Sequence, residues 1–269
     1  MSFLQLENKK ILVFGVFNKK SIAYYAAKTL IEEGAEVILS VRDEQTKKSI
    51  QEYFPETDVF VCNIENQDDL KKLAEDVSNR HGKLDGMLHS IAFADFSEGF
   101  KPFHETKKEH FLQAIDISCF SLINISNVLK DLLNKDASVI TLSVPFTKVA
   151  VENYSYMAPV KAALESSVVY LAKSFSHFSH IRFNALCLGF LKTSAAAGIP
   201  KFMKYYAFSE KLTFRKRALD TAEAANIIAF MMSNKSSAIN AQTITADAGL
   251  SVNWFDEEVV DSVEKTLFS

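Results

Sequence analysis

A strand, a glycine turn and the start of a helix follow one another in Ile11-Leu12-Val13-Phe14-Gly15-Val16-Phe17-Asn18-Lys19-Lys20-Ser21-Ile22-Ala23. The four apolar residues predict a buried strand, and Gly15 permits the tight turn that leads to a helix expected at 21–33. The free N–H groups and the dipole at such a helix start bind anions such as a pyrophosphate. The GxGxxG pattern of dinucleotide-binding turns is absent, so an ordinary turn capped by Ser21 explains the segment equally well.

Short apolar runs and longer amphipathic segments alternate along the rest of the chain. Strands are expected at 11–14, 36–40, 59–62, 86–89, 138–142, 181–186 and 243–245, and helices at 21–33, 67–81, 109–134 and 154–174. Right-handed crossovers then predict an α/β protein with a Rossmann-type doubly wound parallel sheet and helices on both faces. No linker rich in Pro, Gly or Ser divides residues 1–269, so a single domain is expected, with ligands beyond the carboxyl ends of the strands.

Composition and charge narrow the class of partner. The 269 residues have a net charge of -3 and are 48% hydrophobic. Nucleic-acid binding favours a strongly basic face, so a small-molecule or protein substrate is expected and no nucleic acid. The cysteines, Cys62, Cys119 and Cys187, have neither metal-ligand nor disulfide spacing, so no metal site is expected. A secretory signal and a run of about 18 uninterrupted apolar residues are both absent, which predicts a cytoplasmic protein without membrane insertion.

Two further strand ends carry candidate contacts to a nucleotide. Arg42 and Asp43 follow the second strand, where an acid binds a ribose 2′-hydroxyl and an arginine accommodates a 2′-phosphate, so NADH and NADPH both remain open. Asn63 and Ile64 follow the third strand and are candidates for an amide contact and an apolar contact to adenine. A polar loop residue and a core isoleucine are the plainer interpretation of that pair.

Tyr154 and Lys161 form the strongest candidate for chemistry. They stand seven residues apart after a strand that ends near Ser143, and seven residues make almost two helical turns, which would put both side chains on one face. The ammonium suits nicotinamide-ribose hydroxyls, and the phenol suits a carbonyl oxygen that gains negative charge. Pro159 favours a first helical turn, so the helix is expected to begin near it, with Tyr154 in the preceding loop. A surface lysine and a partly buried tyrosine are the alternative.

Taken together, these segments resemble the NAD(P)H-dependent enoyl-acyl-carrier-protein reductases of bacterial fatty-acid synthesis, within the short-chain dehydrogenase/reductase superfamily. The resemblance extends from Lys10 to about Val252. It rests on Gly15 with Ser21-Ile22-Ala23, His89-Ser90-Ile91-Ala92-Phe93-Ala94, Asp116-Ile117-Ser118, Tyr154 with Lys161, and Leu164-Glu165. Carbonyl-reducing members place their tyrosine where this chain has Met157, so the enoyl-reductase spacing is the one satisfied.

The resemblance implies roles for particular residues. Tyr154 would hydrogen-bond the thioester carbonyl while hydride passes from nicotinamide C4 to the β-carbon of a trans-2-enoyl thioester, and the enolate would then be protonated at the α-carbon. Lys161 would hold the nicotinamide ribose. The other implied cofactor contacts are Gly15, Ser21, Ile22, Arg42, Asn63, Ile64, Ser90, Ile91, Ala92, Gly189, Leu191 and Thr193. The implied substrate contacts are Ala94, Val144, Tyr154, Met157, Ala195, Phe202 and Tyr205.

The resemblance also implies a substrate lid at about 194–214, an acyl carrier protein as partner and a homotetramer. The lid segment is strongly apolar, as an acyl chain requires, although a folded-in core helix is the alternative. The basic side chains around it could dock an acidic carrier protein. The alternative is that they are ordinary solvated surface residues. This basic cluster comprises Lys192, Lys201, Lys204, Lys211, Arg215, Lys216 and Arg217.

Three positions depart from the family pattern. Val144 stands where the family usually has a second aromatic residue, Phe190 replaces a proline, and Asn63 replaces an aspartate. Phe190 is expected to crowd the nicotinamide end of the site. Val144 and Phe190 keep open a catalytically silent or regulatory dinucleotide-binding homologue. A carbonyl reductase of the same superfamily is the second alternative, and the tyrosine spacing disfavours it.

Overall fold

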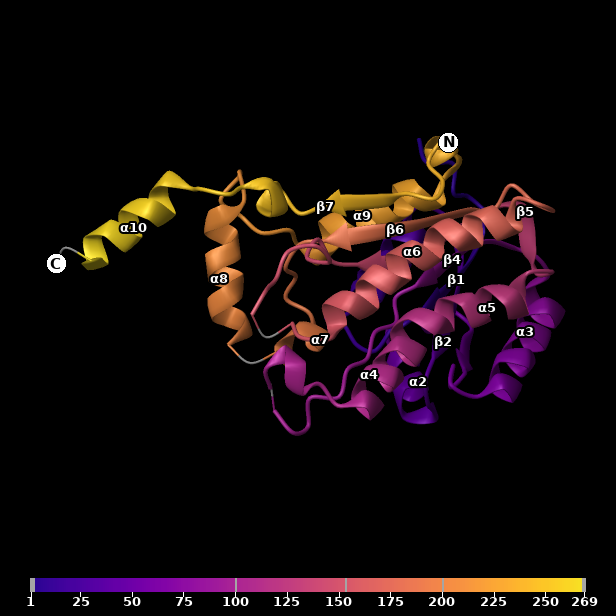
Figure 1. Cartoon of the computed structure of the whole chain (residues 1–269). Coiled ribbons are helices and arrows are strands. Elements are labelled where there is room, and N and C mark those ends of the chain that lie inside the picture. The colour runs from indigo at the N-terminus through magenta and orange to yellow at the C-terminus, as the bar shows by residue number, and fades with distance from the viewer. Residues whose placement is uncertain (1–2, 100, 153, 200, 268–269) are drawn as a thin grey trace.

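The computed structural model describes residues 3–99, 101–152, 154–199 and 201–267. Within these residues, seven parallel strands form one sheet in the order β3-β2-β1-β4-β5-β6-β7 (Figure 1). The strands are β1 (Lys10–Phe14), β2 (Glu36–Val41), β3 (Val59–Val61), β4 (Leu84–His89), β5 (Leu133–Ser143), β6 (Arg182–Leu188) and β7 (Thr243–Ala246). The order changes direction between β1 and β4, the switch point of a doubly wound sheet, so the predicted Rossmann-type fold is confirmed.

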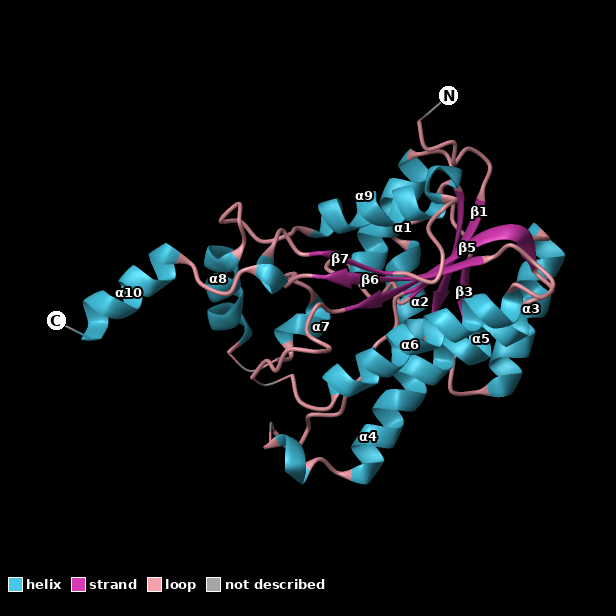
Figure 2. Cartoon of the chain, turned by 45° about the horizontal axis from the view of Figure 1, so that its top comes forward, coloured by secondary structure: helices cyan, strands magenta, loops and turns pink. Residues whose placement is uncertain are grey.

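Helices cover both faces of this sheet (Figure 2). The helices on one face are α1 (Ile22–Glu32), α2 (Glu44–Gln51) and α9 (Thr221–Met232). Those on the other face are α3 (Gln67–His81), α4 (Lys108–Ile115), α5 (Ser121–Leu129) and α6 (Met157–Phe175). Beyond the carboxyl ends of the strands lie α7 (Ser194–Ala197), α8 (Phe202–Leu212) and α10 (Glu257–Leu267).

The central strand β1 explains why its sequence is apolar without interruption. Ile11 and Val13 enter the core beneath α1 and α9, whereas Leu12 and Phe14 enter the core beneath α3, α5 and α6. All four side chains are at most 1% exposed. A parallel strand that is covered on both faces buries every side chain, so a continuous apolar run marks it better than an alternating pattern.

Two expected helices have the wrong bounds. The helix expected at 109–134 is interrupted by a π-turn at Asp116–Phe120 and ends with α5 at Leu129, and β5 already begins at Leu133. Leu132 and Leu133 are buried and extend the helical pattern in the sequence, although Leu133 starts a strand. The helix expected at 154–174 begins only at Met157, so Pro159 lies in its first turn and Tyr154 in the turn before it, as predicted from the proline.

The helical stretch Lys108–Leu129 is long and apolar enough, by length and composition alone, to cross a membrane. Half of its apolar window is buried inside the domain, against the sheet and α6. Buried helices in the cores of globular proteins meet the same criteria, so the stretch is weak evidence for a membrane span.

The expected lid segment 194–214 contains α7 and α8. Both lie at the carboxyl edge of the sheet, next to the ends of β6 and β7 (Figure 1). The last helix, α10, projects away from the sheet beyond α8 (Figures 1 and 2). The carboxyl edge, where ligands of doubly wound sheets bind, is therefore flanked by the segment expected to cover a substrate.

Candidate active site

Gly15 directly follows β1 and lies against the loop that follows β4. Its backbone φ of +88° is left-handed, and a Cβ built on it would lie 2.0 Å from the carbonyl oxygen of Ser90. Any side chain would therefore both strain the backbone and push the two loops apart. The structure thus brings together two segments with predicted cofactor contacts, Gly15 to Ile22 and Ser90 to Ala92.

Ser21 and Asn18 organise the start of α1. The Ser21 hydroxyl accepts from Tyr24 N (3.3 Å) and donates to Asn18 O (2.7 Å), so it acts as the helix N-cap. Asn18 Oδ1 accepts from Ser194 Oγ at 2.9 Å, which joins the β1–α1 loop to the start of α7. The first N–H groups of α1, those of Ile22 and Ala23, have no partner within the helix and can bind an anion. Asn18 and Ser194 carry no motif in the sequence and were missed.

Some side chains after β2 and β3 form hydrogen bonds within their own turns, and others are free to bind a ligand. The Asp43 carboxylate caps α2 by accepting from Thr46 N at 2.7 Å, and this bond lowers its pKa. Arg42 next to it is exposed. Asn63 Oδ1 accepts from Glu65 N at 3.3 Å and so helps to form its own turn, while Ile64 packs partly buried against the core. Arg42 is thus the open charged group at the end of β2.

Lys161 lies on α6 with its ammonium inside the protein. The side chain is 5% exposed, and Nζ donates to Leu142 O, near the end of β5, at 2.8 Å. Burial lowers the lysine pKa to about 8, although Cys119, Cys187 and Glu165 oppose this shift. One of the three ammonium protons is bound to Leu142, which leaves two for a ligand.

Tyr154 precedes α6 in a turn and packs partly buried against the core. Burial raises the pKa of its phenol, and the neighbouring Cys187 and Glu165 raise it further. The group therefore stays protonated and can donate a hydrogen bond. Among the described residues no hydrogen bond joins Tyr154 to Lys161, but both side chains have Cys187 and Glu165 as electrostatic neighbours and so lie in one region of the site.

Glu165, one turn after Lys161, forms a polar network that the sequence did not predict as part of the site. Its Oε1 accepts from Ser143 Oγ at 2.6 Å and from Cys187 Sγ at 3.4 Å, and its Oε2 accepts from Thr147 Oγ1 at 3.2 Å. The carboxylate thereby ties the ends of β5 and β6 to α6. In the sequence, Leu164-Glu165 carries the family resemblance without an assigned role, and the helical spacing from Lys161 is the signal that could have revealed Glu165.

Tyr156 is turned away from this network. It is 4% exposed and its hydroxyl donates to Asp95 O at 2.7 Å, in the loop after β4. Ser155 between the two tyrosines has a left-handed φ of 48°, a strained conformation for serine that lets neighbouring side chains point apart. A small cavity of about 30 Å³ lies between Ser155, Tyr156 and the segment 95–110. Only Tyr154 of this pair faces Glu165 and Cys187.

Phe190 packs sideways into a row of aromatic rings. Its centroid lies 5.0 Å from that of Phe146 and 6.2 Å from that of Phe202, and Phe202 lies 5.9 Å from Tyr206. The row runs from the loop after β5 through the loop after β6 to α8. Phe202 and Tyr206 are buried there, whereas Tyr205 and Val144 are half-buried.

The remaining predicted residues after β4 and β6 occupy mixed environments. Ser90, Ile91 and Ala94 are half-buried and Ala92 is exposed, while Met157 is 7% exposed at the start of α6. Gly189 N donates to Ala246 O at 3.2 Å, and Leu191 is buried in the core. Thr193 Oγ1 accepts from Ala196 N at 3.2 Å, at the start of α7. The side chain of Ala195 lies outside the described part of the chain.

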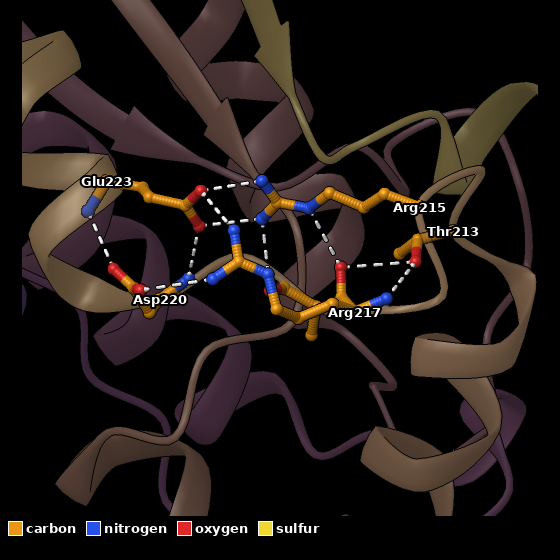
Figure 3. Close-up of polar contacts among 6 residues, drawn as sticks. Thr213, Arg215, Arg217, Asp220 and Glu223 are labelled. Carbon is orange, nitrogen blue, oxygen red and sulfur yellow. Dashed lines mark hydrogen bonds and ion pairs between the residues drawn. The ribbon is translucent and has the colours of Figure 1, made fainter.

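The basic cluster is partly neutralised within the protein. Arg215 binds both carboxylate oxygens of Glu223 at 2.6 Å, and Arg217 binds Glu223 at 3.0 Å and Asp220 at 3.9 Å (Figure 3). Lys216 pairs with Asp256, and Lys192 Nζ lies 4.2 Å from the ring centroid of Tyr206. Three exposed lysines, Lys201, Lys204 and Lys211, have no ion pair among the described residues.

Comparison with known proteins gives a consistent result. The family model described as Enoyl-(Acyl carrier protein) reductase matches residues 15–251. The chain is 34% identical over 246 residues to the NADH-dependent enoyl-[acyl-carrier-protein] reductase FabI of Enterococcus faecalis, covering 91% of this chain and 98% of that protein. It is 32% identical over 251 residues to the NADPH-dependent FabI of Staphylococcus aureus, with coverages of 91% and 98%. The crystal structure of the NADH-dependent reductase of Aquifex aeolicus superposes with a TM-score of 0.89 at 30% identity, covering 93% of this chain and 99% of that one.

Proposed function

The chain belongs to the enoyl-acyl-carrier-protein reductase family, and we propose that it reduces trans-2-enoyl-acyl-carrier-protein thioesters to saturated acyl thioesters in fatty-acid synthesis, with NADH or NADPH as hydride donor. The observation that carries this proposal is the shared environment of Tyr154 and Lys161. A protonated phenol and a buried amine both lie beside Glu165 and Cys187, where β5 and β6 end. That edge of a doubly wound sheet is its ligand site.

The residues present fit a dinucleotide. At Gly15 the backbone comes so close to Ser90 that only the space of a hydrogen is left, and the N-terminus of α1 begins a few residues later. A glycine turn followed by free helix N–H groups is the standard cradle for a pyrophosphate. Lys161 keeps two protons for ribose hydroxyls after its bond to Leu142 O. When bound, the dihydronicotinamide supplies the hydride.

The chain's own residues would act mainly by binding and polarisation. Tyr154 donates its phenolic proton as a hydrogen bond to the thioester carbonyl, whose oxygen gains the electron pair as hydride reaches the β-carbon. Its raised pKa keeps the proton on the phenol, so Tyr154 can donate this hydrogen bond throughout the hydride transfer. Glu165 holds Ser143 and Cys187 in fixed positions around the reacting region.

The lid at 194–214 is proposed to close over the acyl chain. Support comes from the aromatic row of Phe146, Phe190, Phe202 and Tyr206, which joins α8 to the loops after β5 and β6. The ring of Phe190 packs toward α8 rather than standing alone at the nicotinamide end. The family's proline has thereby been replaced by a side chain that makes an apolar contact with the lid.

Further parts of the proposal concern partners and location. Lys201, Lys204 and Lys211 are exposed on or next to α8 and suit an acidic acyl carrier protein. A homotetramer is expected from the family resemblance, and exposed apolar side chains on the outer face of α4 to α6 support self-association. These are Leu112, Phe120, Val169 and Tyr170. The cysteines are free and buried, which suits the reducing cytoplasm.

The activity is tested by following the loss of NADH or NADPH with crotonyl and longer trans-2-enoyl thioesters. Consumption that depends on the enoyl substrate supports the proposal. Cofactor binding without turnover at every chain length would instead support a silent homologue. A ketoacyl thioester tests the carbonyl-reductase alternative, which is disfavoured because Met157 occupies the tyrosine position of those enzymes and is buried.

Substitutions at the two candidate residues test the site itself. Tyr154→Phe should lower kcat on the order of 100-fold with little change in cofactor Kd, because it removes one donor to the developing oxyanion. Lys161→Ala should weaken cofactor binding as well, since the lysine is proposed to touch the ribose. Tyr156→Phe is the matched control, because its hydroxyl binds Asp95 O instead. Equal effects of Tyr154→Phe and Tyr156→Phe on kcat would remove Tyr154 from the site.

A further inference from the structure

The π-turn at Asp116–Phe120 lies behind the loop that follows β4. The N–H of Ser121 bonds Asp116 O, five residues back, and the Ser121 hydroxyl donates to Ile117 O at 2.6 Å. The carbonyl that an α-helix would have bonded to the Ser121 N–H is therefore satisfied by the side chain of the same residue. Single π-turns inside α-helices are rare and occur frequently at functional sites.

His89, the last residue of β4, connects this turn to β5 by hydrogen bonds. It is 0% exposed, with Nε2 at 2.8 Å from Ser121 Oγ and Nδ1 at 2.8 Å from Thr141 Oγ1 on β5. With the Ser121 proton on Ile117 O, a neutral ring bonds both hydroxyls when Nε2 donates to Ser121 Oγ and Nδ1 accepts from Thr141 Oγ1. Burial and the charge of Lys161 lower the pKa of His89 to about 3, so the ring is neutral and serves as a fixed bridge.

Ser118, in the middle of the π-turn, holds the loop beyond His89. Its side chain is 0% exposed; Oγ accepts from Phe93 N at 2.8 Å and donates to Phe93 O at 3.0 Å. One hydroxyl thus satisfies both backbone groups of Phe93, as a neighbouring strand would in a sheet. The same loop contacts Gly15 through Ser90 O, so its path sets the distance between the two proposed cofactor segments.

We infer that Ser118 is a positioning residue for the dinucleotide: through Phe93 it fixes the backbone of 90–94 against Gly15. This inference rests on the proposed function, because Ser90, Ile91 and Ala92 of that stretch are proposed to line the cofactor. In the π-turn, the Ser118 hydroxyl bonds the Phe93 backbone while the Ser121 hydroxyl bonds His89. Cys119, between them, lies 3.6 Å from Ser167 Oγ on α6, so the turn also contacts the helix that carries Lys161.

The inference is tested with Ser118→Ala, the hydroxyl-retaining Ser118→Thr, and Ser126→Ala as matched control. Ser126 lies on α5, is also 0% exposed, and its hydroxyl has no partner among the described residues. Loss of two hydrogen bonds should raise the Kd of NADH or NADPH roughly 10-fold in Ser118→Ala, measured by fluorescence titration. The KM of the enoyl thioester should change less than about two-fold, and Ser126→Ala should leave the cofactor Kd unchanged.

Hydrogen exchange at the Phe93 amide gives a second, direct measurement. Exchange should become faster in Ser118→Ala and stay slow in Ser126→Ala, whether or not Ser118→Thr fits the buried site. An unchanged cofactor Kd in Ser118→Ala, or equal losses in cofactor and substrate affinity, would overturn the inference. If the unmodified protein binds cofactor but reduces no enoyl thioester, the proposed function fails while the comparison of Kd values still tests Ser118. A protein that binds neither cofactor removes both.

Discussion

The cofactor side and the lid side of the site are held together by different kinds of interaction. On the proposed cofactor side, Gly15, Ser90 and the π-turn meet through a backbone contact that excludes even a Cβ and through uncharged hydrogen bonds, buried at His89 and part-buried at Phe93. At the lid base, the segment 213–223, half-exposed charged side chains connect the end of α8 to α9 (Figure 3). The first region is defined by shape and the second by charge.

This difference predicts which substitutions should affect each region most. Buried hydrogen bonds and close backbone contacts cannot be replaced by water, so their loss leaves polar groups unsatisfied or forces the backbone to move. Exposed ion pairs compete with water and salt and contribute little each. The cofactor side should therefore respond strongly to small uncharged substitutions, and the lid base only weakly to loss of a charge.

Gly15→Ala should have the largest effect. The added Cβ would lie 2.0 Å from Ser90 O and the left-handed φ would strain any other residue, so we expect cofactor affinity to fall by more than about 100-fold. Gly82→Ala is the control, because Gly82 also has a left-handed φ of +71° but has no atom within 4 Å of its added Cβ. Titration of both variants with NADPH separates the steric contact from backbone strain. Equal losses in the two variants would show that shape does not govern this region.

The sequence was sufficient to predict the sheet because each buried parallel strand is a short, continuous apolar run. The carboxyl end of each strand was placed to within two residues, although β5 begins five residues earlier than expected, and the carboxyl edge then followed from the topology. The proline at 159 was enough to predict that Tyr154 precedes α6. The end of α5 was missed because buried leucines serve a helix and a strand equally well, and periodicity does not separate the two.

The supporting contacts of the site could not be predicted in the same way. Ser118 and Phe93 are 25 residues apart, and Ser194 and Asn18 are 176 apart, so no local pattern connects them. A serine is common in loops and helices, and only the fold reveals that these hydroxyls bind a particular backbone group. The pairing of Arg215 and Arg217 with Glu223 was likewise missed, since the sequence shows the positive charges together and not their partners.

His89 makes the cofactor side sensitive to acid. Burial lowers its pKa in the folded protein to about 3 from the ordinary 6.5, so between these pH values the unfolded chain binds a proton that the folded one does not. Stability is therefore fully present above pH 6.5 and is lost as pH falls toward 3. Between pH 7 and pH 5 this one group should cost on the order of 2 kcal/mol of unfolding free energy.

Urea unfolding at pH 7 and pH 5 measures this change in unfolding free energy. His89→Gln should be less stable than the unmodified protein at neutral pH, yet it should lose less stability on acidification. His180→Gln is the control, because His180 is exposed at the opposite end of the sheet. A His89→Gln protein with the same pH dependence as the unmodified one would contradict the buried neutral brace.

Arg42 combines features of both regions, because it is an exposed charged residue on the proposed cofactor side. Asp43 caps α2, which leaves Arg42 as the open group at the proposed ribose position. Arg42→Ala should raise the KM of NADPH roughly 10-fold and leave the KM of NADH nearly unchanged, since only NADPH carries a 2′-phosphate. Lys48→Ala, which removes an exposed charge on α2, is the control. Equal changes for the two cofactors would exclude Arg42 from the ribose site.

Glu223→Gln should have the smallest effect of the four. The substitution keeps an oxygen for the Asp220 N–H, which Glu223 accepts at 3.0 Å in the capping box, but removes the charge that binds Arg215 and Arg217. We expect a loss of about 1 kcal/mol or less in unfolding free energy and a small rise in the KM of the enoyl thioester, both disappearing at high salt. Cofactor Kd should not change. Glu223→Ala loses the cap as well and should cost about 1 kcal/mol more, independently of salt. If Glu223→Gln weakened cofactor binding, or if its effect persisted at high salt, the lid base would be as tightly specified as the cofactor side and the contrast between them would fail.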